Sequence, residues 1–585
     1  MRKLTIFSSI SLMLIVLSFN SNSLFGQKTL IEIDAIYPED VRMEGFVLNS
    51  SQRVAVDAVG FYYRDGGNRI LLGNSWILDA DSREVVWDLS EADSKRRKRG
   101  LLEFSDDVSL PKGVYEVYYA SYPMRSFSNI NIDELGEFLG SFFRSWFRGN
   151  RDYYKEEMWD LFREFKIVIK GDGESLSKED VYTLQEKQKN DAFIWISGDK
   201  KNLYKSIGFI ANQAVEIEVY SIGEFSKDEN HDYGWIQEVI SRERVWELSY
   251  RKSDEAGGAR KNRMRRSTLT LPKGKYSVVY STDDSHLPRR WNSQPPYDPE
   301  FWGIIVNLKN PKDMKKVEYF DSDEFFNERT VVNLTKVRNS EVVSYGFKLK
   351  KDMDLNIYCV GEGVSREMVD HGWIIDASDR GRVWEMKYRD TKHAGGAKKN
   401  RVFDEVVRFR KGEYIAYYVT DGSHSYRMWN SSPPSDQQAW GLRLISLDSK
   451  FDADDVEEYE EKEDENVLAS VINVGNNDMI SARFILKERK RIRIYAIGEG
   501  SGGQMYDYGW IEDLHSGRTI WEMSYRITKH AGGAKKNRMF DGTIVLEPGE
   551  YEVRYETDGS HSFNDWNASQ PYDPFNWGIT VRVVE

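Results

Sequence analysis

The segment TDGSHSFNDWNASQPYDPFNWG, near the end of the 585-residue chain, gathers side chains that carry chemistry in many proteins. Asp558 and His561 are of the types that bind metal ions or move protons. Trp566, Asn567 and Tyr572 would suit a sugar, because an aromatic ring packs on the sugar face and an amide bonds its hydroxyls. The segment therefore raises three hypotheses: a metal site, an active site and a ligand-binding loop.

The segment occurs three times without a gap, since residues 282–303 and 420–441 have the same pattern. Each copy follows a block of the type HAGGAKKNR, whose Gly-Gly turn and basic residues could receive an anion. The candidate ligand-binding residues are Asp558, His561, Trp566, Asn567, Tyr572 and Arg538, together with Asp421, His424, Trp429, Asn430, Arg401, Asp283, His286, Trp291, Asn292 and Arg263 at the matching positions.

Matching positions argue against a metal made from these loops. In the first of the three copies Ala256 follows Ser-Asp-Glu, so no histidine occupies the position of His393 and His530, and Asp565 is not shared by the other copies. The ligands left in common are one histidine and a few carboxylates, too few for zinc. We therefore expect neither a metal nor another cofactor.

Catalysis is also disfavoured. Ser560 and His561 are adjacent in the chain and do not form a triad, because neighbouring side chains rarely meet. Three similar copies of one constellation are more typical of binding modules than of active sites. The alternative left open is structural: Asp558 ends a strand as an Asx turn, His561 locks the loop through a hydrogen bond, and Trp521 and Trp577 lie in the core.

The repeats also predict the fold. The tryptophan of a GWI motif recurs at Trp235, Trp373 and Trp510, a period too long for a solenoid unit. Short runs such as GEYEVRYETD alternate apolar and polar residues, as strands with one buried face do. We expect an all-β chain of four antiparallel, jelly-roll-like β-sandwich modules, called repeats 1 to 4 below and covering residues 28–171, 192–308, 330–447 and 467–585.

Repeat 1 is divergent and carries an insertion at residues 131–166 in place of the shared loop. Apolar residues at helical spacing predict a helical hairpin there, and its aromatic face at residues 133–165 is a candidate surface for docking a protein. The single cysteine, Cys359, aligns with Ser221 and Ala496, which predicts an inert buried thiol.

The N-terminus and the composition indicate where the protein works. Residues 1–26 have the charged start, apolar run and small residues of a signal peptide, so we expect export to the periplasm or beyond. No later stretch is apolar enough for a transmembrane segment in the mature chain. The net charge of −13 argues against nucleic acid as a partner.

The blocks WEM-YR, HAGGA-KNR and DDSHS-WN resemble those of bacterial secreted proteins built from tandem β-sandwich repeats, over residues 205–585. This resemblance implies the sandwich fold and no particular activity. We expect a non-catalytic, exported protein that binds or scaffolds through its repeated loops, with a glycan or another envelope protein as partner. A secreted hydrolase acting on carbohydrate and a purely structural envelope spacer are the alternatives.

Overall fold

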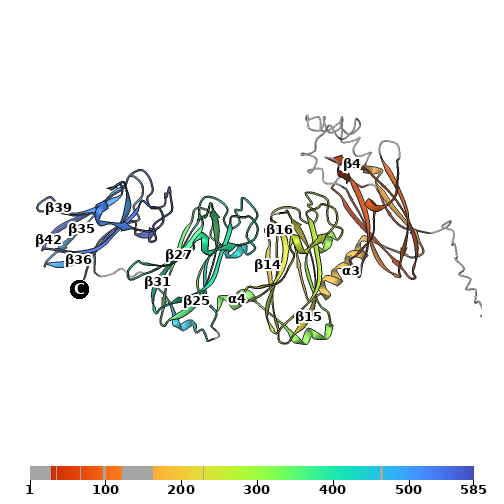
Figure 1. The fold of residues 1–585 in the computed structure, drawn as a ribbon, viewed down its shortest axis with the longest axis horizontal. Helices are drawn as coiled ribbons and strands as arrows, with labels where there is room; N and C mark the ends of the chain where they lie inside the picture. Colours follow the sequence, from red (N-terminus) through yellow and green to blue (C-terminus); the bar gives the residue numbers. More distant parts are fainter. Residues whose placement is uncertain are drawn as a thin grey trace, which may run out of the picture. The chain divides into compact units, whose positions relative to one another are not determined.

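The computed structural model describes residues 28–584 apart from 35, 38, 66–67, 97–100, 122–161, 228, 449 and 461–465. Antiparallel β-sheets make up most of it, which confirms the all-β, multi-sandwich prediction (Figure 1). The expected signal peptide and nearly all of the expected helical insertion lie outside the described residues. Among the described helices, none has the length and apolar character needed to cross a membrane.

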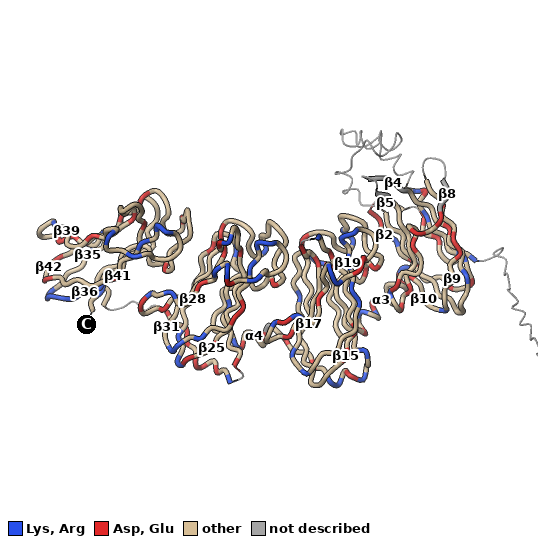
Figure 2. The backbone as a smooth tube through the Cα atoms, viewed as in Figure 1, with Lys and Arg blue, Asp and Glu red and all other residues tan. Residues whose placement is uncertain are grey.

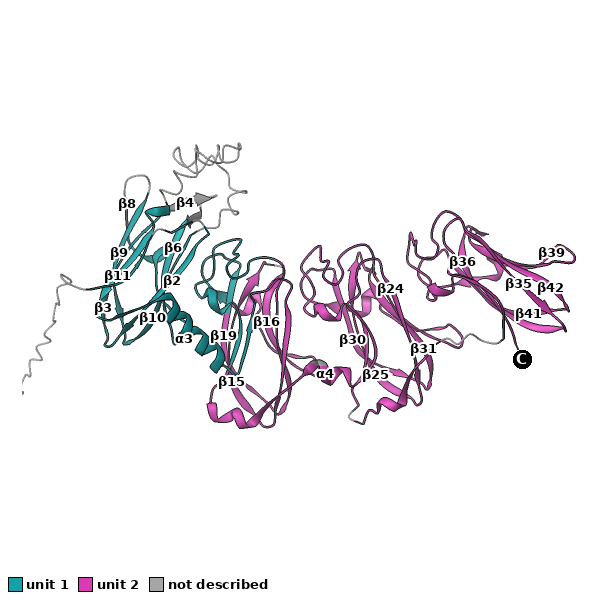
Figure 3. Ribbon diagram, turned by 180° about the vertical axis from the view of Figure 1, so that it is seen from behind, with its two compact units in different colours: residues 1–199, 254–264, 285–306 teal, residues 200–253, 265–284, 307–585 magenta. Residues whose placement is uncertain are grey.

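The chain divides into two compact units (Figure 3). Unit 1 holds residues 1–199, 254–264 and 285–306, and unit 2 holds residues 200–253, 265–284 and 307–585. Repeat 2 thus contributes to both units.

Unit 1 contains two five-stranded sheets, in the orders β1-β11-β3-β9-β8 and β12-β2-β10-β6-β7. Their inward faces share one core, in which Phe46, Val56, Tyr115 and Ile167 are buried. The strands are β1 (Lys28–Ile33), β2 (Val41–Leu48), β3 (Gln52–Gly60), β6 (Gly73–Asp79), β7 (Val85–Asp88), β8 (Ser94–Arg96), β9 (Leu102–Leu110), β10 (Gly113–Ser121), β11 (Lys166–Gly171) and β12 (Glu174–Leu176), with a separate hairpin of β4 (Tyr62–Asp65) and β5 (Asn68–Leu71).

A helix follows the last strand of repeat 1, where the sequence suggests only a polar connection. Helix α3 (Lys178–Asp191) begins with a capping box, in which Ser177 and Asp180 each accept the other's backbone N–H. Its buried Val181 packs with Met43 and Trp76 on one of the sheets. The helix therefore covers a sheet face of repeat 1.

Repeat 2 supplies β13 (Ile194–Ser197), which pairs with β21 (Gly303–Leu308). In unit 2 its strand β20 (Gly274–Ser281) pairs with β14 (Tyr204–Ala211) and β16 (Asn230–Glu238). Its remaining strands are β15 (Val215–Phe225), β17 (Arg244–Glu247), β18 (Asp254–Glu255), β19 (Asn262–Leu271) and β22 (Val317–Phe320), and the short helix α4 (Ser322–Asn327) follows.

Repeats 3 and 4 have matching sheets, except that one sheet of repeat 3 has an additional edge strand among the described residues. In repeat 3 the orders are β23-β32-β25-β30-β29, with β26 paired to β25, and β28-β27-β31-β24-β33. The strands are β23 (Thr330–Thr335), β24 (Val342–Leu349), β25 (Met353–Val364), β26 (Glu367–Met368), β27 (His371–Asp376), β28 (Arg382–Glu385), β29 (Lys392–His393), β30 (Asn400–Phe409), β31 (Gly412–Val419), β32 (Gly441–Ser446) and β33 (Val456–Glu458).

In repeat 4 the orders are β34-β43-β36-β41-β40, with β37 paired to β36, and β35-β42-β38-β39. Tyr551, Val553 and Tyr555 of β42 are buried, as the alternation in GEYEVRYETD predicts, but Glu552 between them is buried as well. The strands are β34 (Val467–Ile472), β35 (Met479–Leu486), β36 (Lys490–Ser501), β37 (Gln504–Met505), β38 (Tyr508–Asp513), β39 (Arg518–Glu522), β40 (Lys529–His530), β41 (Asn537–Leu546), β42 (Gly549–Glu556) and β43 (Gly578–Val583).

Candidate functional site

The histidine of the repeated loop lies inside the protein. His561 has no exposed surface, and its Nε2 lies 2.6 Å from Oδ1 of Asn537 in β41. Its ring stands edge-on to Trp566 and Trp577, with centroids 5.2 and 5.8 Å away. Burial, followed by the charge of Lys536, lowers the His561 pKa to about 4. A neutral, enclosed imidazole holds the loop onto β41 and is not presented to solvent.

The same arrangement recurs in the other copies. His424 bonds Asn400 at 2.7 Å, and His286 bonds Asn262 at 2.7 Å. Trp429 packs edge-on against Trp440, as Trp291 does against Trp302. The buried positions of Trp577 and Trp521 confirm the core role expected for those tryptophans.

The remaining predicted residues have partners within their own loops. Asn567 accepts a hydrogen bond from Lys536, and Asn430 accepts one from Lys399. His286 Nδ1 lies 2.8 Å from Asn292. The arginines are partnered as well. Arg538 donates a hydrogen bond to Thr528 and lies over the ring of Tyr525. Arg401 contacts Thr391 and Tyr388 in the same two ways, and Arg263 forms an ion pair with Glu255.

Tyr572 and the aspartates differ from this pattern. Tyr572 contacts repeat 3, because its backbone oxygen accepts a hydrogen bond from Trp373. Asp558 does not pair with His561 among the described contacts, since its Oδ1 accepts the N–H of Ser560. The structure therefore does not gather His561, Trp566 and Arg538 around one exposed hollow, and it places Asp558 in a different cluster.

That cluster consists of carboxylates. Glu499 at the end of β36, Asp507 just before β38 and Asp558 just after β42 each place an oxygen within 4.8 Å of the others. The Asp507 side chain has no exposed surface and Glu499 only 7%. The backbone N–H of Asp558 donates to Asp507 Oδ1 at 2.8 Å, which fixes the loop against the hairpin. We call these residues the carboxylate site of repeat 4.

Repeats 2 and 3 contain the same site. Glu362, Asp370 and Asp421 form it in repeat 3, and Glu224, Asp232 and Asp283 form it in repeat 2. The N–H of Asp421 donates to Asp370 Oδ1 at 2.8 Å, and that of Asp283 donates to Asp232 Oδ1 at 2.9 Å.

The protein satisfies the buried oxygens of this site only in part. Within the described residues, Glu499 Oε2 and Glu362 Oε2 form no hydrogen bond, and the indoles of Trp577 and Trp440 are the only donors beside Asp507 Oδ2 and Asp370 Oδ2. Buried carboxylate oxygens are nearly always paired or bound to a metal, so two unsatisfied glutamate oxygens at matched positions are unusual. Lys536 and Lys399 contact the other oxygen of Glu499 and Glu362, at 3.0 and 3.1 Å. One cation for three carboxylates leaves the sites of repeats 3 and 4 negative, whereas in repeat 2 His231 Nδ1 lies 3.3 Å from Asp283.

Burial and the neighbouring negative charges raise the pKa values of the aspartates. Burial first, and then repulsion from the neighbouring carboxylates, raises the pKa of Asp507 to about 7 and that of Asp370 to about 8. The pKa values of Glu499 and Glu362 are raised as well, again mainly by burial. Such shifts show that the site holds its full charge at a free-energy cost unless something positive is bound.

The oxygen donors determine which cation would fit. A hard divalent ion such as Ca²⁺ prefers carboxylate oxygens and completes its shell with water or carbonyls. Zinc prefers nitrogen or sulfur, and the nearby histidines of repeats 3 and 4 bond asparagines instead. The site combines three separate segments of each repeat, so the two repeated loops alone do not reveal it. The signal was present as a glutamate, an aspartate eight residues later and a second aspartate 51 residues beyond it, in all three repeats.

Comparisons with known proteins give little further help. No family model matches the chain, and no curated protein matches it. Among solved structures, the CUB1-EGF-CUB2 domains of human MASP-1/3 match 44% of this chain and 98% of their own, at 10% identity and a TM-score of 0.14. The CBM32-1, CBM32-2 and M60 catalytic domains of Clostridium perfringens ZmpB match 66% of this chain and 51% of their own, at 9% identity and a TM-score of 0.12. These scores are too low to support an argument about function.

Proposed function

We propose that the chain is an exported, non-catalytic, multi-repeat binding protein that holds a divalent cation of the calcium type in each of repeats 2, 3 and 4. The cation and the loop around it form the contact with an oxygen-rich partner, a glycan or another envelope protein. One observation carries the proposal: the same three carboxylates converge in three repeats and leave buried oxygens unsatisfied in repeats 3 and 4.

The geometry leaves room for an external ligand. Ca²⁺ takes six to eight oxygens, and three side chains cannot supply them all. Glu499 and Asp507 close the inner side of the site, whereas Asp558 reaches the surface. Hydroxyls or carboxylates of a partner could therefore complete the shell from the solvent side.

A basic cavity beside one site favours an acidic partner. A hollow of about 650 Å³ is lined by Lys227, Lys398 and Lys399, among others, and Lys399 also contacts Glu362 of the repeat 3 site. Elsewhere, basic and acidic residues are interspersed along the strands (Figure 2). An acidic polysaccharide would meet both the lysines and the bound cation.

The first experiment measures cation binding. Calcium is titrated calorimetrically into the full chain after treatment with a chelator, and native mass spectrometry counts the bound ions. We expect three ions for the unchanged chain, two for Asp507→Asn and one for Asp507→Asn combined with Asp370→Asn. Asp565→Asn is the matched control, because Asp565 lies in the same loop but outside the cluster. Absence of binding at millimolar calcium would refute the proposal.

The second experiment identifies the partner class. The full chain is applied to neutral and carboxylated polysaccharides, with calcium or with chelator. We expect retention on the carboxylated polymers that chelator abolishes and that Lys398→Glu weakens. Equal retention with and without calcium would show that the partner does not contact the cation.

A further inference from the structure

The loop that supplies Asp558 to the carboxylate site also joins repeat 4 to repeat 3. Asp573, near the end of this loop, is 2% exposed. Its carboxylate lies 3.4 Å from Arg380 and accepts a hydrogen bond of 3.1 Å from Tyr417, both in repeat 3. It also accepts one of 3.0 Å from Tyr495 of its own repeat. One buried carboxylate thus ties two repeats together.

Tyr572 extends the contact. Trp373 of repeat 3 donates from Nε1 to the backbone oxygen of Tyr572 at 2.7 Å, and the Tyr572 hydroxyl donates to Glu385 at 3.1 Å. Phe575 packs on Tyr417 with ring centroids 6.1 Å apart. We call residues 572–576 the docking segment of repeat 4.

Equivalent contacts exist elsewhere. In unit 2, Gln437 of repeat 3 donates to Ser281 and Thr282 of repeat 2, at 3.0 and 3.1 Å. In unit 1, Trp76 donates to the backbone oxygen of Tyr297 at 2.6 Å. Arg83 there bonds Asp298, as Arg380 contacts Asp573.

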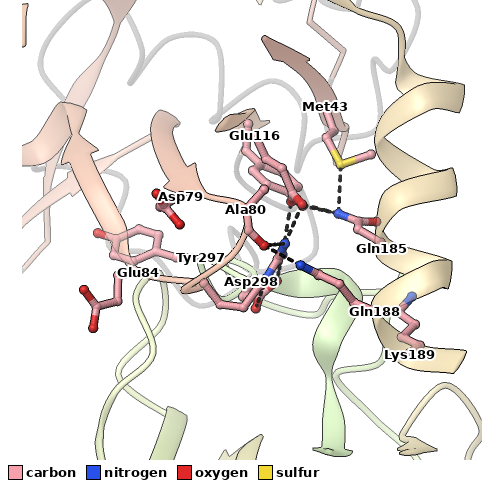
Figure 4. A network of polar contacts seen from close by, with 12 residues as sticks. Met43, Asp79, Ala80, Glu84, Glu116, Gln185, Gln188, Lys189, Tyr297 and Asp298 are labelled. Atoms are coloured by element: carbon pink, nitrogen blue, oxygen red, sulfur yellow. Dashed lines mark hydrogen bonds and ion pairs between the residues drawn. The ribbon is translucent and has the colours of Figure 1, made fainter. Parts of the chain in front are cut away.

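Arg83 also donates to Glu116, which accepts a further hydrogen bond from Gln185 of α3; Figure 4 labels Glu116, Gln185 and Asp298 within this network of polar contacts. Arg83 Nε donates to Asp298 at 3.0 Å.

A tryptophan connects the docking segment to the carboxylate site. Trp577 follows the segment directly, and its backbone N–H donates to Pro574 within it at 3.2 Å. Its indole lies beside the Asp507 carboxylate and, as a hydrogen-bond donor, lowers the pKa of Asp507. Trp577 is completely buried, so it cannot move without displacing its neighbours. Trp577 therefore contacts the carboxylate site with its side chain and the docking segment with its backbone.

We propose that a divalent cation in the carboxylate site of repeat 4 strengthens the docking of residues 572–576 on repeat 3. The inference rests on the cation site proposed above. The cation neutralises the site and holds Asp507 and Asp558 in one position, which orders both ends of the loop. By linkage, docking must strengthen cation binding by the same factor.

The test measures both directions of this linkage in the full chain. Asp232→Asn and Asp370→Asn first remove the other two cation sites. Docking is then weakened by Arg380→Gly or by Asp573→Asn. Glycine is the residue that repeat 4 itself has at the position of Arg380, and the turn there has a positive φ in both repeats, so the backbone tolerates this change. Asp565→Asn again serves as the control.

The first readout is the calcium affinity of the remaining site. A coupling free energy at the low end of the usual range predicts a calcium affinity about fivefold lower in both docking variants. The calcium affinity of the control should be unchanged.

The second readout is a distance distribution between spin labels at Val406→Cys and Ile485→Cys, which are 55% and 64% exposed. Cys359 is fully buried and does not compete for label. We expect a narrow distribution with calcium, a broader one with chelator, and a broad one in both docking variants.

The outcomes separate the two proposals. If calcium binds but neither its affinity nor the distances respond to the docking variants, the coupling is refuted and the cation sites stand. If the unchanged chain binds no calcium, the cation sites fail and the coupling fails with them.

Discussion

Asp507 should make the cation-free repeat 4 less stable as the pH rises from about 4 to about 7. Its pKa is about 7 in the folded protein and about 3.9 in an unfolded chain. Between these values the folded state keeps a proton that the unfolded state has lost, so unfolding releases a proton and a higher pH favours it. Each unit of pKa shift corresponds to about 1.4 kcal/mol, and a shift of about three units sets an upper limit of about 4 kcal/mol.

The decisive comparison is with Asp507→Asn. The amide keeps an oxygen to accept the N–H of Asp558 but cannot ionise. His561, with its lowered pKa of about 4, has the opposite effect, because it favours the folded state as the pH rises towards 6.5. Both proteins contain His561, so its contribution cancels in their difference. That difference should grow from near zero at pH 4 to at most about 4 kcal/mol in favour of the variant at pH 8.

Hydrogen exchange followed by mass spectrometry gives a local readout, which suits a chain whose repeats need not unfold together. Peptides from β36 and β42 are compared in chelator at several pH values, after correction for intrinsic exchange. Protection in the unchanged protein should fall relative to Asp507→Asn by up to about a thousandfold, and calcium should restore it. An equal pH dependence in the two proteins would refute the reasoning.

Three further predictions concern the core of the repeats. His561→Ala removes the bond to Asn537 and two ring contacts, so exchange protection of the loop should fall by an amount equivalent to about 3 kcal/mol; a loss below 1 kcal/mol would show that the loop holds itself. Gly533→Ala should destabilise repeat 4 in calorimetry, because φ is +61° and a Cβ would clash with the Gln570 carbonyl; unchanged melting would contradict this. Cys359 should react with a thiol reagent only on unfolding, since burial raises its pKa; fast labelling of the native protein would contradict this.

The sequence predicts the sandwich fold because its signals are local. Alternating residues such as Tyr551, Val553 and Tyr555 show a buried strand face wherever that strand pairs. The core positions of Trp577 and Cys359 follow from aligning the repeats. These features need no knowledge of which strands are neighbours.

The carboxylate site and the docking contacts need that knowledge. Glu499 and Asp558 lie far apart in the chain. They meet because the end of strand β36 lies beside the start of the loop that follows β42. The contact of Arg380 with Asp573 joins two repeats, so comparing one repeat with another cannot reveal it. Tyr572, one of the three residues that suggested a sugar platform, contacts a neighbouring repeat.

The turn that carries Arg380 gives the array a direction. Arg83, Arg242 and Arg380 all adopt a left-handed backbone, which suits glycine better. Repeat 4 has Gly517 at the position of Arg380. It also has Arg554 where repeat 3 has Tyr417. An arginine tolerates this backbone strain where an interaction with a carboxylate of the next repeat offsets it. Because the docking segment and its receiving turn are different parts of a repeat, the contact is head-to-tail and its order cannot be reversed. Repeats 3 and 4 are therefore not interchangeable parts, and an engineer who exchanged them would have to rewrite residues 517 and 554 to let another repeat follow.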